Sequence, residues 1–223
     1  QIRNTSGENF YNVVIDCAAG GDQSVETQRN ITIENNLTIK EGAFRSYASD
    51  RTITVNGNVV IVNAGVLGGA LGTDRENALD YSFGSLTIES GGEYLATTGT
   101  TTIKGNASSS TNLAWANSGT FTHNGGTVLF DGTNTFGGSS YGHINPATNT
   151  FNNLTIDADS KFIQLRENGT TLTVAGTLTL TDGTLANYGT QTPVLTVTGN
   201  ATIANGATIG GTDTSSAMNF GSL

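Results

Sequence analysis

The chain has 223 residues, of which only 12% are charged, with 30 glycines, 2 prolines and 1 cysteine. Its net charge of −9 argues against a nucleic-acid-binding protein, because phosphates require clustered lysine and arginine. The lone Cys17 excludes a disulfide within the chain, so packing and backbone hydrogen bonds must hold the fold. No apolar run or signal-peptide pattern predicts membrane insertion.

Short strands with period-two alternation are predicted along the whole chain, and no segment of ten or more residues has helical spacing. Glycine or asparagine follows most strands, as expected for tight corners with positive φ. Each turn of chain is expected to contain three such strands. The turns are predicted to begin near Val13, Ile31, Ile53, Leu86, Phe121, Leu154, Leu172 and Leu195.

Four polar segments between these strands are predicted to be loops. They span residues 18–28, 70–82, 105–112 and 137–147. The second contains Asp74 and Asp80, and the fourth contains Tyr141 and His143. We expect these loops to project outward, because their polar residues do not continue the alternating apolar pattern.

The chain repeats itself over a long period. The segment Phe10–Asp16 returns as Phe151–Asp157, 141 residues later, and Leu37 and Gly42 return as Leu178 and Gly183 at the same offset. Kept strand motifs with varying loops are typical of a long unit repeated in tandem. We therefore expect one continuous solenoid over residues 1–223, with a first repeat unit at 10–150 and a partial second unit at 151–223.

These patterns predict an all-β fold, a parallel β-helix (β-solenoid) of about eight coils with roughly 18–25 residues each. The crossover rule for parallel strands predicts right-handed winding. Asparagines stacked at the corners are expected to hydrogen-bond along the axis. Neither end shows a cap, so we expect the chain to stack on further copies of itself or on adjacent repeats.

The phrase Ser118–Thr133, SGTFTHNGGTVLFDGT, followed by TFNNLTI at residues 150–156, resembles tandem β-helix repeats of very large bacterial and archaeal surface or secreted proteins. This resemblance covers nearly the whole chain. It implies a structural or adhesive role at the cell surface or outside the cell, and it supplies no active site to carry over.

Carboxylates sit mainly at predicted loops and corners. They are Asp16, Asp22, Asp74, Asp80, Asp131, Asp157, Asp159 and Asp182. Polysaccharide-degrading β-helix enzymes use clustered acids on one face. Asp16 and Asp157 are repeat equivalents, however, and a catalytic group should occur once. We therefore expect no enzyme activity and assign no catalytic, cofactor-binding or metal-binding residue.

No cofactor is expected, with calcium as the alternative. Gly20, Gly21 and Asp22 with Asp16, or the loop Asp74–Asp80, would supply oxygen ligands for that ion. The serial glycine-rich calcium repeat is absent from the sequence. A zinc site at His123 and His143 is disfavoured, because no cysteine lies near either residue.

Aromatic residues gather in the middle of the chain. They are Trp115, Phe121, Phe130, Phe136 and Tyr141. Packing inside a wide coil is the favoured interpretation, and a stacking platform for sugars is the alternative.

Three functions remain open at this stage. The leading hypothesis is a structural rod in an extracellular fibre or cell-surface protein, assembled by end-to-end or tandem stacking. The second is an adhesin or tail-spike-like stalk that presents loops 70–82 and 137–147 to glycans. The third, a polysaccharide-degrading enzyme, requires one unrepeated carboxylate.

Overall fold

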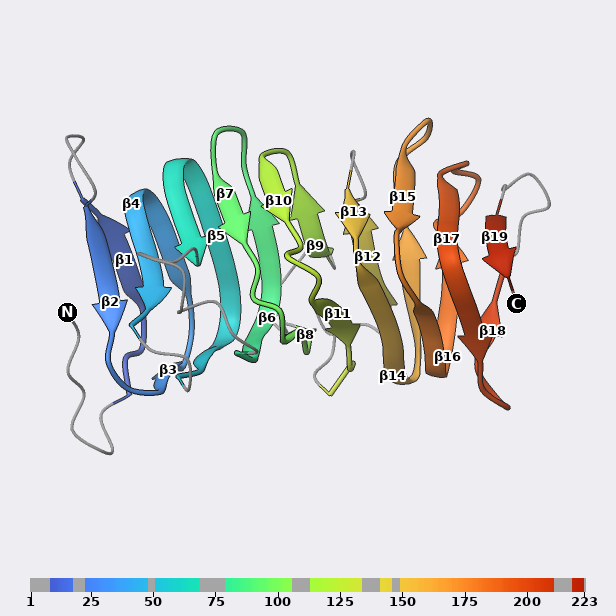
Figure 1. Cartoon of the computed structure of the whole chain (residues 1–223), viewed down its shortest axis with the longest axis horizontal. Helices are drawn as coiled ribbons and strands as arrows, with labels where there is room; N and C mark the ends of the chain where they lie inside the picture. Colours follow the sequence, from blue (N-terminus) through green and yellow to red (C-terminus); the bar gives the residue numbers. More distant parts are fainter. Residues whose placement is uncertain are drawn as a thin grey trace. The chain divides into compact units, whose positions relative to one another are not determined.

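The computed structural model describes residues 9–17, 23–47, 51–68, 79–105, 113–133, 141–145, 149–210 and 218–222. All regular secondary structure in these residues is β-strand, and the strands pair in parallel into a β-solenoid of about seven turns. The expected fold class, drawn in Figure 1, is confirmed. The structure has about seven turns, and the sequence predicted about eight. The right-handed winding stays a prediction from the crossover rule.

The chain forms two compact units. Unit 1 comprises residues 1–101 and 117–126, and unit 2 comprises residues 102–116 and 127–223. The first ten strands are β1 (Val13–Asp16), β2 (Ser24–Thr27), β3 (Ile31–Ile33), β4 (Leu37–Ser46), β5 (Ile53–Gly68), β6 (Tyr81–Ile88), β7 (Glu93–Leu95), β8 (Thr100–Ile103), β9 (Leu113–Asn117) and β10 (Thr120–Thr122). The others are β11 (Thr127–Phe130), β12 (Tyr141–Asn145), β13 (Thr150–Phe151), β14 (Asn153–Leu165), β15 (Thr171–Val174), β16 (Leu178–Asn187), β17 (Val194–Ile203), β18 (Thr208–Ile209) and β19 (Met218–Ser222).

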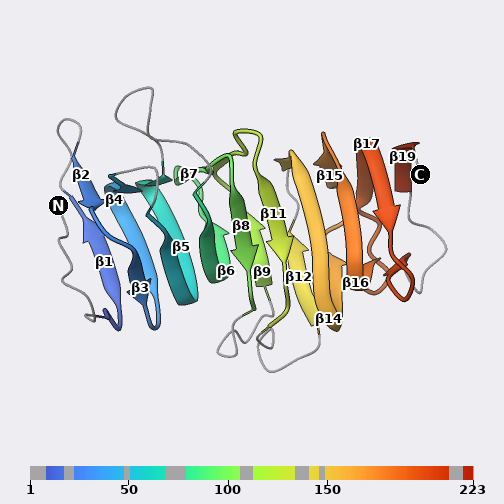
Figure 2. The ribbon, with the colours of Figure 1, turned by 60° about the horizontal axis from the view of Figure 1, so that its bottom comes forward.

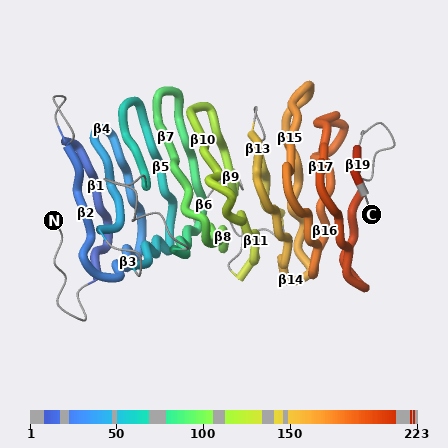
Figure 3. The backbone as a smooth tube through the Cα atoms, viewed as in Figure 1, coloured from blue at the N-terminus to red at the C-terminus, as the bar shows by residue number. Residues whose placement is uncertain are grey.

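Unit 1 arranges its strands in three rows, one strand of each turn per row. The first row pairs β3 with the start of β5, and that segment with the start of β6. The second pairs β1, the start of β4, the middle of β5 and the end of β6. The third pairs β2, the end of β4, the end of β5, β7 and β10. Successive turns within the unit can be followed along the backbone tube (Figure 3).

Unit 2 also has three rows. The first pairs β13, β15, the start of β17 and β19. The second pairs β11, the start of β14, the start of β16 and the end of β17. The third pairs β9, β12, the end of β14, the end of β16 and β18. In the first row, the arrows of β13, β15 and β19 point the same way (Figure 1), and Figure 2 shows the same ribbon turned.

Aliphatic side chains stack in register to form the interior. In unit 1, Ile15, Ile39, Ile61 and Ile88 occupy paired positions of the second row, and all four are buried. In unit 2, Leu178 lies between Leu154 and Ala201 and is also buried. Each apolar residue thus covers its counterpart one turn away, and apolar burial of this kind is the main stabilising contribution to the fold.

The two repeat copies have the same strand register. Ile31 pairs with Ile53 in unit 1 as Leu172 pairs with Leu195 in unit 2. Val13 pairs with Leu37 as Leu154 pairs with Leu178. The corner glycines Gly42 and Gly183 also match, with φ of 78° and 84°. The strands of each unit therefore pair in the same register, as expected from the long repeat in the sequence.

Other corners use short polar residues. Asn63 has a φ of 45° in β5, and Asp159 has a φ of 46° in β14. Both residue types tolerate the left-handed region, because their side chains can hydrogen-bond locally. The sequence pattern predicts glycine, asparagine or aspartate at such corners, and these two residues agree with it.

At two equivalent corners, glycine is required by lack of space. A Cβ on Gly57 would lie 2.3 Å from the carbonyl oxygen of Asn35 in the preceding turn. A Cβ on Gly199 would lie 2.1 Å from the carbonyl oxygen of Gly176. Adjacent turns therefore approach each other too closely at this corner for any side chain.

An asparagine ladder runs along another corner of unit 1. The Asn36 amide N–H donates to Asn12 Oδ1 at 3.1 Å, and the Asn58 amide N–H donates to Asn36 Oδ1 at 2.9 Å. The Ser85 hydroxyl continues the series by donating to Asn58 Oδ1 at 2.5 Å. The expectation of axial hydrogen bonds between stacked asparagines is confirmed. Each asparagine side chain thus accepts a hydrogen bond from the next turn, and for Asn12 and Asn36 the donor is a backbone amide.

Three of the expected loops are partly wrong. Within the expected loop 18–28, Ser24–Thr27 form β2 and pair with the end of β4. Residues 141–145, assigned to a loop, form β12 in the third row of unit 2. Residues Tyr81 and Ser82 begin β6 and pair with Ile53 and Thr54, so this turn starts five residues before the expected Leu86. In all three places, neighbouring glycine-rich or charged residues obscured a short strand segment. The loop at 105–112 lies outside the described residues except at Gly105.

Replacing Leu178 by alanine tests the stacked interior. We expect Leu178→Ala to lower the free energy of unfolding by about 2–5 kcal/mol, because the fully buried side chain leaves a cavity. The neighbouring Thr179→Ala, on the outer surface of the same strand, should cost less than about 1 kcal/mol. Urea unfolding followed by circular dichroism measures both, and equal losses would contradict the assignment of Leu178 to the interior.

Replacing Asn36 tests the ladder. We expect Asn36→Ala to cost about 1–2 kcal/mol, because the Asn58 amide loses its acceptor. Asn36→Asp is the matched control, since it keeps an oxygen at this position and should retain most of the stability. A loss in Asn36→Asp as large as that in Asn36→Ala would show that the acceptor is not what matters.

Candidate groove on the outer surface of unit 2

The third row of unit 2 carries a ladder of outward-facing side chains whose size changes abruptly. Strand register aligns Tyr141 with Phe162, Phe162 with Thr184, and Thr184 with Thr208 in successive turns. Their sequence neighbours Ile163 and Leu185 are buried, so the ladder lies on the opposite, outer face of the strands. Two aromatic rings are therefore followed by two small hydroxyl side chains.

The two rings pack against each other. The ring centroids of Tyr141 and Phe162 lie 5.1 Å apart with an angle of 22° between the planes. The two residues stay 42% and 36% exposed, which is high for large aromatic side chains. Tyr141 covers Phe162 on one side only. The other side of the Phe162 ring faces the space that the small Thr184 side chain leaves in the next turn.

The change from aromatic to small side chains produces a groove with a volume of about 540 Å³. Its lining is aromatic, small or polar without charge. The lining residues are Tyr141, Phe162, Gln164, Thr184, Ala186, Asn187, Gly189, Thr208 and Gly210. The lining combines apolar ring surface with uncharged hydroxyl and amide groups.

A smaller depression of about 250 Å³ adjoins this groove and shares Tyr141, Gln164 and Gly189 with it. Tyr188 forms its side. The Tyr188 ring contacts the His143 ring edge-to-face at 4.7 Å, and the Arg166 guanidinium carbon lies 4.9 Å from the centre of the Tyr188 ring. Arg166 Nη1 also lies 3.4 Å from His143 Nδ1. These contacts fix the position of Tyr188 without placing a charge in the groove lining.

The groove belongs to one repeat copy. Ser24 pairs with Ala43 in the third row of unit 1, as Phe162 pairs with Thr184 in unit 2. Ser24 of unit 1 therefore occupies the position that Phe162 occupies in unit 2. In contrast, Tyr47 of unit 1 and Tyr188 of unit 2 are equivalent residues of the same type. The fold forms with either residue at this position, so packing does not require the exposed ring of Phe162.

No family model, curated protein or solved structure matches the chain. In the described ranges there is no helix of the length and apolar character needed to cross a membrane. The resemblance to surface-protein repeats consequently stays a prediction.

The aromatic cluster expected from the sequence is mostly interior. Trp115 and Phe130 are fully buried, and the Trp115 ring meets the Phe151 ring edge-to-face at 5.0 Å. Phe121 is half-buried and stacks on Tyr94 at 5.6 Å. The packing interpretation is confirmed for these residues, and Tyr141 is the exposed exception. Phe136 lies outside the described residues.

Phe162 and Tyr188 were missed in the sequence analysis. Alternation in the segment Phe162–Leu165 would have placed Phe162 opposite the apolar Ile163 and Leu165, and therefore outside. Its contact with Tyr141 required knowledge of the register between turns.

The candidate acids serve separate corners among the described residues. Asp16 is exposed and lies 3.4 Å from Lys40 Nζ. Asp80 Oδ1 accepts a hydrogen bond from the Thr100 amide at 2.8 Å, and Asp131 Oδ1 accepts from the Thr133 amide at 3.0 Å. Asp182 Oδ1 accepts from the Gly183 amide at 2.5 Å. Asp157 occupies the strand position equivalent to Asp16, while Asp22 and Asp74 lie outside the described residues.

Metal ligands do not cluster in the part of the chain that the structure describes, where no three His, Cys, Asp or Glu side chains come together. The expected calcium ligands at Gly20–Asp22 and most of those at 74–80 lie outside the described residues. Nδ1 of His123 accepts a hydrogen bond from the Gly125 amide at 3.0 Å. Cys17 is a half-buried free cysteine beside the Gly42 corner, as its repeat equivalent Ala158 suggested.

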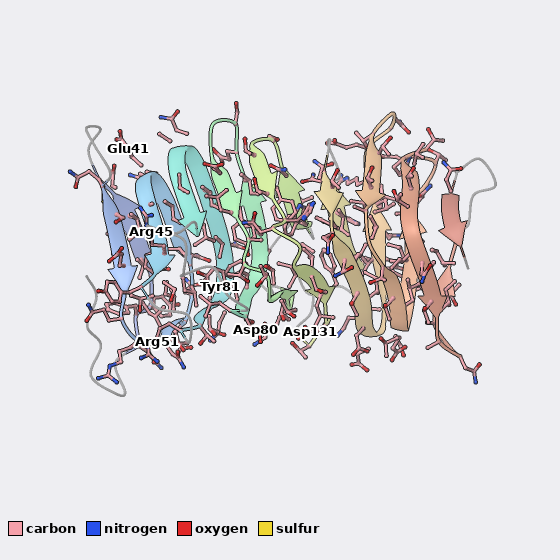
Figure 4. All side chains as sticks on the ribbon, viewed as in Figure 1. Glu41, Arg45, Arg51, Asp80, Tyr81 and Asp131 are labelled. Atoms are coloured by element: carbon pink, nitrogen blue, oxygen red, sulfur yellow. The ribbon has the colours of Figure 1, made fainter. Side chains whose placement is uncertain are left out.

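Two tyrosines in unit 1 point into the interior. Tyr81 follows Asp80 at the start of β6 (Figure 4), and burial raises the pKa of its phenol to about 12 despite a backbone hydrogen bond with Ser46. Burial also raises the pKa of Tyr94, whose hydroxyl lies 2.6 Å from Thr101 Oγ1. Loss of a proton from either phenol would place a charge among apolar side chains.

These tyrosines predict a loss of stability at alkaline pH. Above about pH 10 the unfolded chain releases phenol protons, whereas folded Tyr81 keeps its proton until about pH 12. The unfolded state therefore binds fewer protons in this range, and the free energy of unfolding falls as pH rises. Urea unfolding at pH 9, 10 and 11 should show this decline, and Tyr81→Phe should make it shallower. An unchanged slope in Tyr81→Phe would contradict the assignment.

Proposed function

We propose that the chain is a structural segment of an extracellular fibre or cell-surface protein, in which solenoid turns stack along the polypeptide. The observation that carries this proposal is the strand register shared by the two repeat copies. Further copies in a longer chain can pair their strands in the same way. Tandem solenoid repeats of this type contact only their neighbours and can extend in one dimension.

The partners in this proposal are adjacent repeats of the same chain or further copies of it. Support comes from the outer edges of the described strands in unit 1 and unit 2. Backbone N–H and C=O groups of β1 pair with β4 on one side, and those of β19 pair with β17 on one side. A strand edge of this kind is a template for another parallel strand.

The proposal assigns the chain no catalytic role and no required cofactor. Its support is that Asp16 and Asp157 hold equivalent corner positions in two copies of one structural unit. The polysaccharide-degrading alternative predicts instead that a single unrepeated carboxylate is essential for activity. Assays on plant, algal and bacterial polysaccharides with the purified chain would reveal such an activity, and a positive result would replace this part of the proposal.

Immunogold electron microscopy tests the location. Antibodies raised against the purified chain should label filaments or the outer surface of intact cells that produce the protein. Permeabilised cells are the control for antibody access. Label that appears only after permeabilisation would contradict an extracellular or surface role.

Sedimentation at increasing protein concentration tests assembly between copies. Stacking through strand edges should raise the weight-average mass in steps of the 23.0 kDa chain. Adding a proline in β1, as in Val14→Pro, should weaken this association, because proline removes a strand donor. Proline at exposed Tyr11, outside the strands, is the control. A concentration-independent monomer would restrict stacking to repeats within one polypeptide.

A further inference from the structure

We propose that the groove beside Phe162 binds a neutral oligosaccharide, with one sugar ring stacked on the Phe162 side chain. This goes beyond the structural role, which requires no ligand. The site lies on strands of the third row of unit 2, and not on the loops considered from the sequence.

The first support is the exposed aromatic surface. Tyr141 and Phe162 keep 42% and 36% of their surface accessible although each is large and apolar. Phe162 is flanked by a ring on one side in the ladder and by the small Thr184 on the other. The apolar C–H face of a pyranose fits against such a ring, and removal of water from both surfaces favours the contact.

The second support is the polar composition around the ring. Gln164, Thr184 and Thr208 offer one amide and two hydroxyl groups within the same groove. These groups both donate and accept hydrogen bonds, as the hydroxyls of a sugar do. A purely apolar partner would leave them without water or a hydrogen-bond partner on binding, which costs free energy.

The third support is charge. The groove lining includes no Asp, Glu, Lys or Arg, and the whole chain carries a net charge of −9. An acidic saccharide would find no cation in the lining and would be repelled by the overall field. The volume of about 540 Å³ accommodates a short oligosaccharide segment lying across successive turns.

The repeat supplies a variant that should fold. Phe162→Ser places in unit 2 the residue that unit 1 already has at the corresponding position, Ser24, in the same kind of strand pair. A second variant, Thr184→Trp, fills the groove from its floor and leaves Phe162 unchanged. Tyr47→Ala is the matched control, because Tyr47 is an aromatic residue of unit 1 with 37% exposure.

The experiment is a glycan array carrying neutral and acidic oligosaccharides, followed by calorimetric titration of the full chain with the neutral oligosaccharide that it retains best. We expect Phe162→Ser and Thr184→Trp each to weaken binding about tenfold or more, and Tyr47→Ala to leave it unchanged. Circular dichroism confirms that each variant is folded before titration.

Three results would overturn the proposal. They are no retention of any neutral oligosaccharide, retention of acidic oligosaccharides alone, or binding that neither groove variant weakens. Phe162 and Thr184 lie in β14 and β16, and not in the edge strands β1 and β19. An absence of glycan binding would therefore overturn this proposal without contradicting the proposed stacking, which sedimentation tests separately.

Discussion

In-register parallel pairing between successive turns is the constraint on which this structure depends. Each turn presents its backbone groups to the next, and corresponding side chains then fall on one another. Ile39 must fit between Ile15 and Ile61, so the interior favours one size and shape of residue along each row. The same constraint brings Gly57 and Gly199 close to carbonyl oxygens of the preceding turn, where no side chain fits.

The pairing also explains how polar residues are used. Corner backbone groups leave the strand ladders and need other partners. Asn12 and Asn36 supply them one turn at a time in unit 1, and Asn153 does so for the Thr177 amide in unit 2 at 3.0 Å. Glu34 links neighbouring turns differently, because its carboxylate accepts hydrogen bonds from Asn9 and Asn56 at 2.6 and 2.8 Å. Polar side chains at these corners thus fix the order of turns without entering the interior.

Much of the fold could be predicted from the sequence because its signals are local. Triplets such as Leu172–Val174 alternate clearly, and repeat offsets show which triplets are equivalent. The beginning of β6 at Tyr81 was missed because acidic loop residues precede it. The groove could not be predicted, because it depends on which residues of different turns become neighbours. Tyr141 and Phe162 are 21 residues apart in the sequence and meet only through strand register.

The ladder from Tyr141 and Phe162 to Thr184 and Thr208 has an evolutionary consequence. An outward position in a solenoid row contributes little to the interior, so its side chain can change size while the backbone keeps its course. A single substitution in one copy of a tandem repeat would then give that copy a surface of its own. Long arrays built in this way could diversify what they display one turn at a time, with every copy sharing the same scaffold.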